Sequence, residues 1–263
     1  MMTAAIIDTK GLQVYVSTEE RAYSRRVHFV TFASPDYGCT RITEEAKEAL
    51  SNARFDTVSI YRDWRLGWRE LCPELFPPSQ HLGYGFFVWK PMVIEHALMN
   101  RAQEGDIVVY ADAGCVLRHA SPEWNFWFSE AANFDVMAFQ IPHIKEREFT
   151  KRATFGAFGL TPEGQHSQSP MAVGCASVWV NTPASRALVN DWVVHCAQKP
   201  LIDDEVGSDE HVDFKAHRHD QSIFSLLLKT RVDAGSVRVW VLNDATYPDL
   251  GARQAIWAAR MKG

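Results

Sequence analysis

The residue best placed for chemistry is Asp112, which ends the apolar run IVVYA and is followed by Ala113 and Gly114. In open α/β sheets, ligands bind at the carboxyl ends of the strands, so a carboxylate at this position could hold a ligand or a cation. An aspartate before a small residue and a glycine also caps turns, which is the alternative interpretation of this pattern.

A second candidate is Lys90, which lies near the end of the glycine- and aromatic-rich segment GYGFFVWKP and begins an expected helix. The ammonium group of a lysine and the free backbone N–H groups of a helix N-terminus together suit a diphosphate. The alternative is that Trp89 and its aromatic neighbours belong to the core, while Lys90 is a solvated helix end.

Asp220 and Gln221 open the apolar part of the segment HRHDQSIFSLLLK. An aspartate at a helix start is a good N-cap, so capping and ligand binding both explain its position. His217 and His219 could add imidazole ligands for a metal. Side chains two positions apart point away from each other, however, unless the segment is extended and curled.

The segment HIKEREFTKR, residues 143–152, concentrates basic side chains in a short stretch. Such a loop could close over an anionic ligand and exclude water, with Lys151 or Arg152 in contact with a phosphate. An ordinary charged surface loop would have the same composition.

Strands that alternate with helices must position these residues. We expect an α/β domain with a mostly parallel central sheet and helices on both of its faces. The expected strands cover 27–33, 56–61, 107–111, 135–140 and 173–180, and the expected helices cover 90–103, 183–198 and a segment that begins near His219. Residues 141–172 and 200–218 are too long for simple connectors and are expected to be site-forming loops.

Composition limits the classes of protein that fit. The 263 residues are 46% apolar, which is enough for the core of one domain over residues 1–263, and a net charge of −5 with scattered basic residues argues against a nucleic-acid partner. The five cysteines contain no C-x-x-C pair, which indicates a reducing compartment. Neither a signal peptide nor a transmembrane segment is visible, so we expect a soluble cytoplasmic protein, with peripheral membrane contact left open.

The order in which these segments follow one another along the chain is similar to that of a known protein family. The run GYGFFVWKP, GDIVVYADAGC, TKR, LIDDE and HRHDQSIFSLL resembles a family of bacterial and viral GT-A-type glycosyltransferases of polysaccharide and glycan assembly. The most specific pieces are WKP, YADAGC and DQSIFS. The resemblance implies a GT-A-like domain with a donor-binding half at about 27–140, an acceptor and catalytic half at about 141–248 and a C-terminal tail at 249–263.

The resemblance also implies a divalent cation, Mn²⁺ or Mg²⁺, held against the donor diphosphate. The Asp-x-Asp motif of this fold falls on Asp112, Ala113 and Gly114, so Asp112 is the expected metal ligand and the second carboxylate is missing. A hard cation needs several oxygen ligands, which phosphates, waters, Asp220 or Asp244 would have to supply.

Other residues receive roles in binding a nucleotide-sugar donor by the same resemblance. The end of the first strand, Thr31, Phe32 and Ala33, would cradle the nucleoside. Lys90 and Lys151 would contact the diphosphate, and the turn after Asp112 would complete the donor site.

Asp220 and Gln221 are the expected catalytic residues, because they look like the Asp-Gln pair beside the transferred sugar in retaining lipopolysaccharide galactosyltransferases. With retention, Gln221 would stabilise the oxocarbenium-like sugar while the leaving phosphate oxygen takes the acceptor proton. With inversion, Asp220 would act as the base. The sequence leaves both open, and the acceptor would be a glycan or another hydroxyl compound.

Two other classes explain parts of the sequence. A non-catalytic carbohydrate- or nucleotide-binding module could stack sugars on its nine tryptophans, although Trp64, Trp68, Trp124 and Trp127 have the helical spacing of core residues. A metal-dependent hydrolase or nucleotidyltransferase could use Asp112, but neither a two-metal carboxylate cluster nor a G-x-x-x-x-G-K-[ST] loop is visible. We therefore expect a glycosyltransferase.

Overall fold

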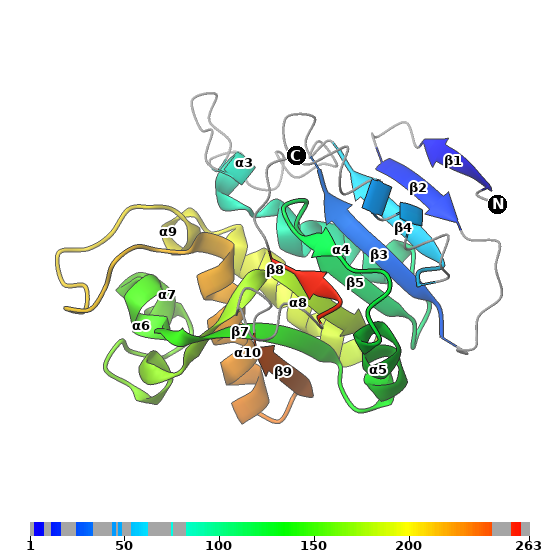
Figure 1. Ribbon diagram of the computed structural model, residues 1–263. Helices are drawn as coiled ribbons and strands as arrows, with labels where there is room; N and C mark the ends of the chain where they lie inside the picture. Colours follow the sequence, from blue (N-terminus) through cyan, green and yellow to red (C-terminus); the bar gives the residue numbers. More distant parts are fainter. Residues whose placement is uncertain are drawn as a thin grey trace.

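The computed structural model describes residues 3–7, 12–16, 25–33, 44–45, 47–48, 54–62, 75, 83–243 and 254–258. Its core is a twisted sheet with helices on both faces (Figure 1). The strands in this part of the chain are β1 (Thr3–Ile7), β2 (Leu12–Val16), β3 (Val27–Phe32), β4 (Thr57–Tyr61), β5 (Ile107–Ala111), β6 (Val116–Leu117), β7 (Val136–Lys145), β8 (Pro170–Val180), β9 (Val239–Asn243) and β10 (Ile256–Trp257). The helical elements there are α3 (Gly83–Phe86), α4 (Trp89–Asn100), α5 (Glu123–Ser129), η2 (Glu130–Ala132), α6 (Glu146–Phe149), α7 (Arg152–Ala157), η3 (Gln165–Gln168), α8 (Pro183–Cys196), α9 (Lys199–Ile202) and α10 (His219–Asp233).

The central sheet has eight strands in the order β1-β2-β4-β3-β5-β8-β7-β9, and β6 and β10 form a separate ribbon. β3 runs parallel to β4 and β5, and β7 runs parallel to β9. The pairs β1-β2, β2-β4, β5-β8 and β7-β8 are antiparallel. The α/β class and the helices on both faces are confirmed. The sheet is mixed rather than mostly parallel, because the apolar pattern within a strand does not encode the direction in which the strand pairs.

The strands β3 and β5 lie in the middle of the sheet, and every residue of both is buried. Valine, isoleucine and aromatic side chains suit this position, because both faces are covered and no alternating polar face is needed. The observed strands match the expected 27–33 and 107–111, whereas β7 and β8 are longer than expected.

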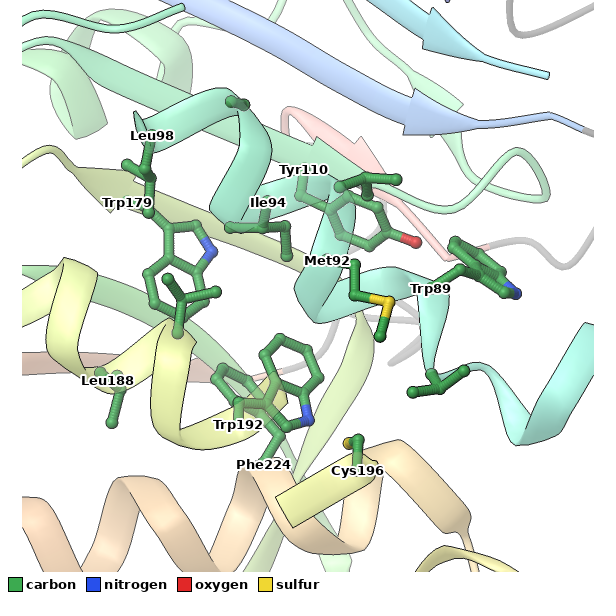
Figure 2. Packing of buried hydrophobic residues seen from close by; sticks show 14 of the residues in the cluster. Trp89, Met92, Ile94, Leu98, Tyr110, Trp179, Leu188, Trp192, Cys196 and Phe224 are labelled. Carbon is green, nitrogen blue, oxygen red and sulfur yellow. The ribbon is translucent and has the colours of Figure 1, made fainter. Parts of the chain in front are cut away.

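One face of the sheet packs against α4, α8 and α10. The ring of Trp192 in α8 stacks on Phe224 in α10 with centroids 4.3 Å apart, and Trp179 of β8 lies beside both rings (Figure 2). α8 begins at Pro183, and Thr182 caps it by accepting a hydrogen bond from a backbone N–H group of the first turn. Each large aromatic side chain removes about 150–250 Å² from water, so this layer fixes the helices firmly on the sheet.

The opposite face packs against α5 and the ribbon of β6 and β10. Trp124 and Trp127 of α5 are 0% and 1% exposed, with ring centroids 5.3 Å apart. These two tryptophans are core residues, as their spacing indicates. Trp64 and Trp68 lie outside the described residues.

The segments expected as loops are partly ordered by helical turns. Residues 141–172 include α6, α7 and η3, and residues 200–218 include the end of α9. The buried carboxylate of Glu146 accepts hydrogen bonds from Thr150 at 2.8 Å and from Ser225 at 2.6 Å, and it pairs with Lys229. These contacts tie the irregular region to α10. No helix in the described part of the chain is both long and apolar enough to cross a bilayer.

Candidate functional site

The candidate site lies where β3 and β5 end. These strands are parallel neighbours, so their carboxyl ends meet at one edge of the sheet. The hydroxyl of Thr31 donates to the carbonyl oxygen of Ala111 at 2.7 Å. The backbone N–H of Asp112 donates to the carbonyl oxygen of Cys175 at 2.8 Å. Asp112 is therefore fixed at the end of β5 by the strands on both sides.

Lys90, Asp112 and Asp220 meet in one ionic cluster. Nζ of Lys90 donates to Oδ2 of Asp112 at 3.1 Å and lies 3.6 Å from Oδ2 of Asp220. The side chains of Lys90 and Asp220 are 7% and 2% exposed, whereas that of Asp112 is 28% exposed. Asp112 therefore forms the open side of the cluster.

The sharp turn between α3 and α4 positions Lys90. Phe86 and Phe87 both have positive φ, at 56° and 66°, a region that residues other than glycine rarely adopt. Nζ of Lys90 lies 4.9 Å from the ring centroid of Phe87 and 5.7 Å from that of Trp89. Trp89 stacks on Phe32 of β3 at 4.4 Å. The aromatic residues are thus packed in the interior, and Lys90 is buried among them rather than solvated.

The start of α10 positions Asp220. His219 has a φ of 50°, and its Nδ1–H donates to the carbonyl oxygen of Ile202 at 2.8 Å. The carbonyl oxygen of Asp220 accepts a hydrogen bond from Nε1 of Trp192 at 3.0 Å. A Cβ atom on Gly174 of β8 would lie 3.0 Å from Oδ2 of Asp220, so no larger residue fits at Gly174 unless Asp220 moves.

Burial and charge set the protonation of the cluster. Burial raises the pKa of Asp220 to about 7, with Asp112 adding to the rise and Lys90 opposing it. Burial lowers the pKa of Lys90, but Asp112 and Asp220 outweigh it, so the pKa lies above its ordinary value. Burial and Asp112 raise the pKa of Tyr110, whose hydroxyl donates to Oδ1 of Asp112. Lys90 is therefore a permanent cation, whereas Asp220 changes its charge near neutral pH.

Two buried polar atoms of the site have no hydrogen-bond partner among the described residues. They are Oδ2 of Asp220 and Nε2 of Gln221. Buried polar groups are normally paired. Oδ2 of Asp220 lies 3.6 Å from the ammonium of Lys90, whereas Nε2 of Gln221 could donate to a hydroxyl group of a ligand. Both belong to the residue pair that the sequence predicts to be catalytic.

The other residues expected to bind a donor lie at the same edge but face inward. Thr31, Phe32 and Ala33 are buried at the end of β3, and Ala113 and Gly114 are buried in the turn after β5. Their contact with a nucleotide stays a prediction.

Lys151 does not belong to the cluster. Its side chain is buried, and Nζ donates to the carbonyl oxygen of Asp203 at 2.8 Å, to Oδ1 of Asp203 at 2.6 Å and to the carbonyl oxygen of Glu205 at 3.0 Å. A lysine ammonium has three donors, so none remains for a phosphate. The expected phosphate contact does not fit this arrangement, and we assign Lys151 to holding the segment after α9. Arg152 pairs with Glu163 on the surface.

The carboxylate oxygens at Asp112 are not free to bind a divalent cation in this structure. Oδ1 of Asp112 accepts from Tyr110 and Oδ2 accepts from Lys90. The ammonium of Lys90 lies between Asp112 and Asp220, where a cation would have to bind. Across the described ranges, no group of three or more His, Cys, Asp or Glu side chains could hold a metal.

The remaining metal ligands that the sequence suggests do not face Asp112 in this structure. Nε2 of His217 binds the carbonyl oxygen of Leu201 at 2.9 Å, and His219 binds that of Ile202. Burial lowers the pKa of His217 to about 3. Asp244 lies outside the described residues.

Sequence reasoning missed Tyr110 and Gly174, although both leave a signal. Tyr110 has the one hydroxyl group in the run IVVYA and lies two positions before Asp112, so an extended chain places both side chains on the same side. Gly174 interrupts the strand pattern VGCASVWV, and an isolated glycine within a strand indicates a close approach of another segment.

No protein-family model matches the chain, and no curated protein matches its sequence. The chain is similar to the structure of a glycosyltransferase involved in the glycosylation of the major capsid of PBCV-1, with 9% identity, a TM-score of 0.47 and coverage of 88% of this chain and 92% of that chain. It is also similar to mouse xyloside xylosyltransferase 1, with 14% identity, a TM-score of 0.42 and coverage of 90% and 95%, respectively. It is similar to the bifunctional glycosyltransferase WbbM as well, with 11% identity, a TM-score of 0.45 and coverage of 93% of this chain and 47% of that chain. TM-scores in this range assign neither a fold family nor an activity to this chain.

Proposed function

We propose that this protein is a nucleotide-sugar-dependent glycosyltransferase with a GT-A-like donor site, which transfers a sugar from a nucleoside diphosphate to a hydroxyl group of a glycan. The observation that carries the proposal is the cluster of Lys90, Asp112 and Asp220 at the end of β5. The motifs WKP, YADAGC and DQSIFS, which carry the sequence resemblance, each supply one member of this cluster.

Lys90 suits the main chemical requirement of glycosyl transfer. The bond between the anomeric carbon and the phosphate oxygen breaks, and its electron pair goes to that oxygen. A fixed positive charge beside the oxygen stabilises the departing diphosphate. Lys90 is permanently charged and is held by Asp112 and by the rings of Phe87 and Trp89, so little reorganisation is needed during the reaction.

We propose that transfer retains the configuration of the sugar. Inversion needs a base that takes the proton of the acceptor hydroxyl. Asp220 is 2% exposed and its Oδ2 faces Lys90 and Gly174, so it is poorly placed to meet an acceptor. With retention, the acceptor oxygen bonds to the anomeric carbon and its proton goes to the leaving phosphate oxygen. Gln221, whose Nε2 has no partner among the described residues, would donate to the sugar.

A non-catalytic binding module has less support from the site. Trp124, Trp127, Trp179 and Trp192 are all buried in the core and cannot stack on a sugar ring. A carboxyl group whose pKa is strongly raised beside a buried cation is instead typical of functional sites in enzymes.

A screen of UDP-, GDP- and dTDP-sugars for hydrolysis and transfer tests the proposal. Asp112→Asn should lower kcat/KM by about 100-fold or more, because the charge that positions Lys90 is lost. The fold should persist, since Asp112 is partly exposed. Asp209→Asn, which changes an exposed carboxylate beside Arg152, is the matched control and should keep full activity.

Full activity in Asp112→Asn would refute the assignment of the site. A failure of every nucleotide sugar to bind or react would refute the function. Stabilisation by free glycan alone, in a thermal-shift assay, would favour the binding module.

A further inference from the structure

Lys90 lies where a divalent cation would have to bind. Its Nζ is 3.1 Å from Oδ2 of Asp112 and 3.6 Å from Oδ2 of Asp220. The carboxylates come from the end of β5 and the start of α10, and they are the oxygen ligands that a hard cation at this edge would need. The ammonium of Lys90, from α4, already lies between the two carboxylates.

We propose that Lys90 replaces the divalent cation in this site, so that a nucleoside diphosphate binds and reacts without a metal. This inference rests on the glycosyltransferase function proposed above. A metal ion bound by Asp112 and Asp220 would have to displace Lys90 from both carboxylates and remain beside its positive charge. The missing second carboxylate of the Asp-x-Asp motif, at Gly114, is consistent with a site that binds no metal.

The geometry leaves Lys90 able to contact a phosphate. A lysine ammonium has three donors. One donates to Asp112 and another faces Asp220, and the described residues offer no acceptor for the third. Because Asp112 is 28% exposed, a diphosphate can approach the cluster from the side of Asp112.

The charge of Lys90 persists throughout the reaction. Its Nζ lies 3.1 Å from Oδ2 of Asp112, 3.6 Å from Oδ2 of Asp220 and 4.9 Å from the ring centroid of Phe87, and each of these contacts favours the charged amine. As the bond between the anomeric carbon and the phosphate oxygen breaks, the electron pair goes to the oxygen. Lys90 donates a hydrogen bond to that oxygen and keeps its proton, while the acceptor proton goes to the leaving phosphate.

Calorimetric titration of the full chain with UDP, GDP and dTDP tests the inference directly. The titrations are made after treatment with EDTA and again with excess Mn²⁺. We expect the Kd of the nucleotide that binds to change by less than about twofold between the two conditions. Binding that requires Mn²⁺ would overturn the inference.

Lys90→Gln provides the complementary test, because it leaves the two carboxylates without their cation. In EDTA the Kd of the diphosphate should rise by about 30-fold or more, as for the loss of one partner of a buried charge contact. Mn²⁺ should restore part of this affinity, and Mn²⁺ should bind to the variant protein alone, as measured by electron paramagnetic resonance. Lys199→Gln, which changes an exposed lysine paired with Glu205, should behave as the wild type does.

The two failures can be distinguished. If no diphosphate binds to the wild type in either condition, the proposed function fails, while Mn²⁺ titration of the proteins alone still tests the position of Lys90. Equal Mn²⁺ affinity in the wild type and in Lys90→Gln would overturn the inference. If Lys90→Gln does not fold, the Mn²⁺ titrations of the wild type test the inference by themselves. Tight binding of Mn²⁺ to the wild type would contradict the role of Lys90.

Discussion

Replacing Gly174 with alanine tests how closely β8 constrains the start of α10. A Cβ atom at this position would lie 3.0 Å from Oδ2 of Asp220 and 3.3 Å from Cβ of Gln221. Non-bonded heavy atoms are most stable at about 3.5–4.0 Å, so both side chains would have to move by about 0.5 Å. The substitution therefore perturbs the cluster through Asp220 and Gln221, which supply the three atoms nearest to the added Cβ.

The expected effects follow from this displacement. Overpacking costs about 1–3 kcal/mol, and the loss of unfolded-state entropy on changing glycine to alanine offsets about 0.4–1 kcal/mol. We expect a net loss of about 1–2 kcal/mol in the free energy of unfolding, or about 2–8 °C in Tm. A displacement of about 0.5 Å at Asp220 should also lower kcat/KM by about tenfold.

Urea unfolding followed by tryptophan fluorescence gives the stability, and hydrolysis of the nucleotide sugar gives kcat/KM. Gly156→Ala is the matched control, because Gly156 is exposed in α7 and no atom outside the nearby backbone of its own helix lies within 4 Å of the added Cβ. Alanine there should be neutral or stabilise by up to about 1 kcal/mol. If Gly174→Ala is as stable and as active as the wild type, the close approach does not constrain Asp220, and the reasoning is wrong.

Two further predictions concern Asp220 and Lys151. Because the pKa of Asp220 is raised to about 7, the site gains a negative charge as the pH rises through this value. This charge repels a bound diphosphate, so nucleoside diphosphate affinity should fall by about three- to tenfold between about pH 6 and about pH 8. Asp220→Asn should abolish this change in calorimetric titrations, and persistence of the change would contradict the assignment. The folded protein also holds this proton more tightly than the unfolded chain does, so the contribution of Asp220 to stability is complete below its ordinary pKa and is lost as the pH rises through about 7. Lys151→Met should lower the free energy of unfolding by about 3–5 kcal/mol, because Asp203 loses its buried partner, while the affinity of the folded protein for the diphosphate stays unchanged. Lost affinity at unchanged stability would instead show that Lys151 binds the phosphate.

The sequence alone indicated where the elements that carry the site residues begin and end, and the family resemblance grouped Lys90, Asp112 and Asp220, together with Lys151, into one site. Asp112 ends a short apolar run, Lys90 precedes Pro91 at a helix start, and Asp220 opens an apolar helix. These are local signals, because run length, turn residues and helix-start residues decide where an element begins and ends. In parallel neighbouring strands the ends must meet at one edge, and Lys90 contacts both carboxylates there.

Only the tertiary structure decided the direction of β7 and β8, the burial of Lys151 and the position of Lys90 between two carboxylates. An apolar strand has the same pattern whether its neighbour runs parallel or antiparallel to it. Lys151 is buried because it meets Asp203, which lies 52 positions further along the chain. Oδ2 of Asp220 has room at its position only because Gly174, on strand β8, has no side chain. Contacts between such distant segments depend on how the whole chain packs, and no local pattern of residues specifies them.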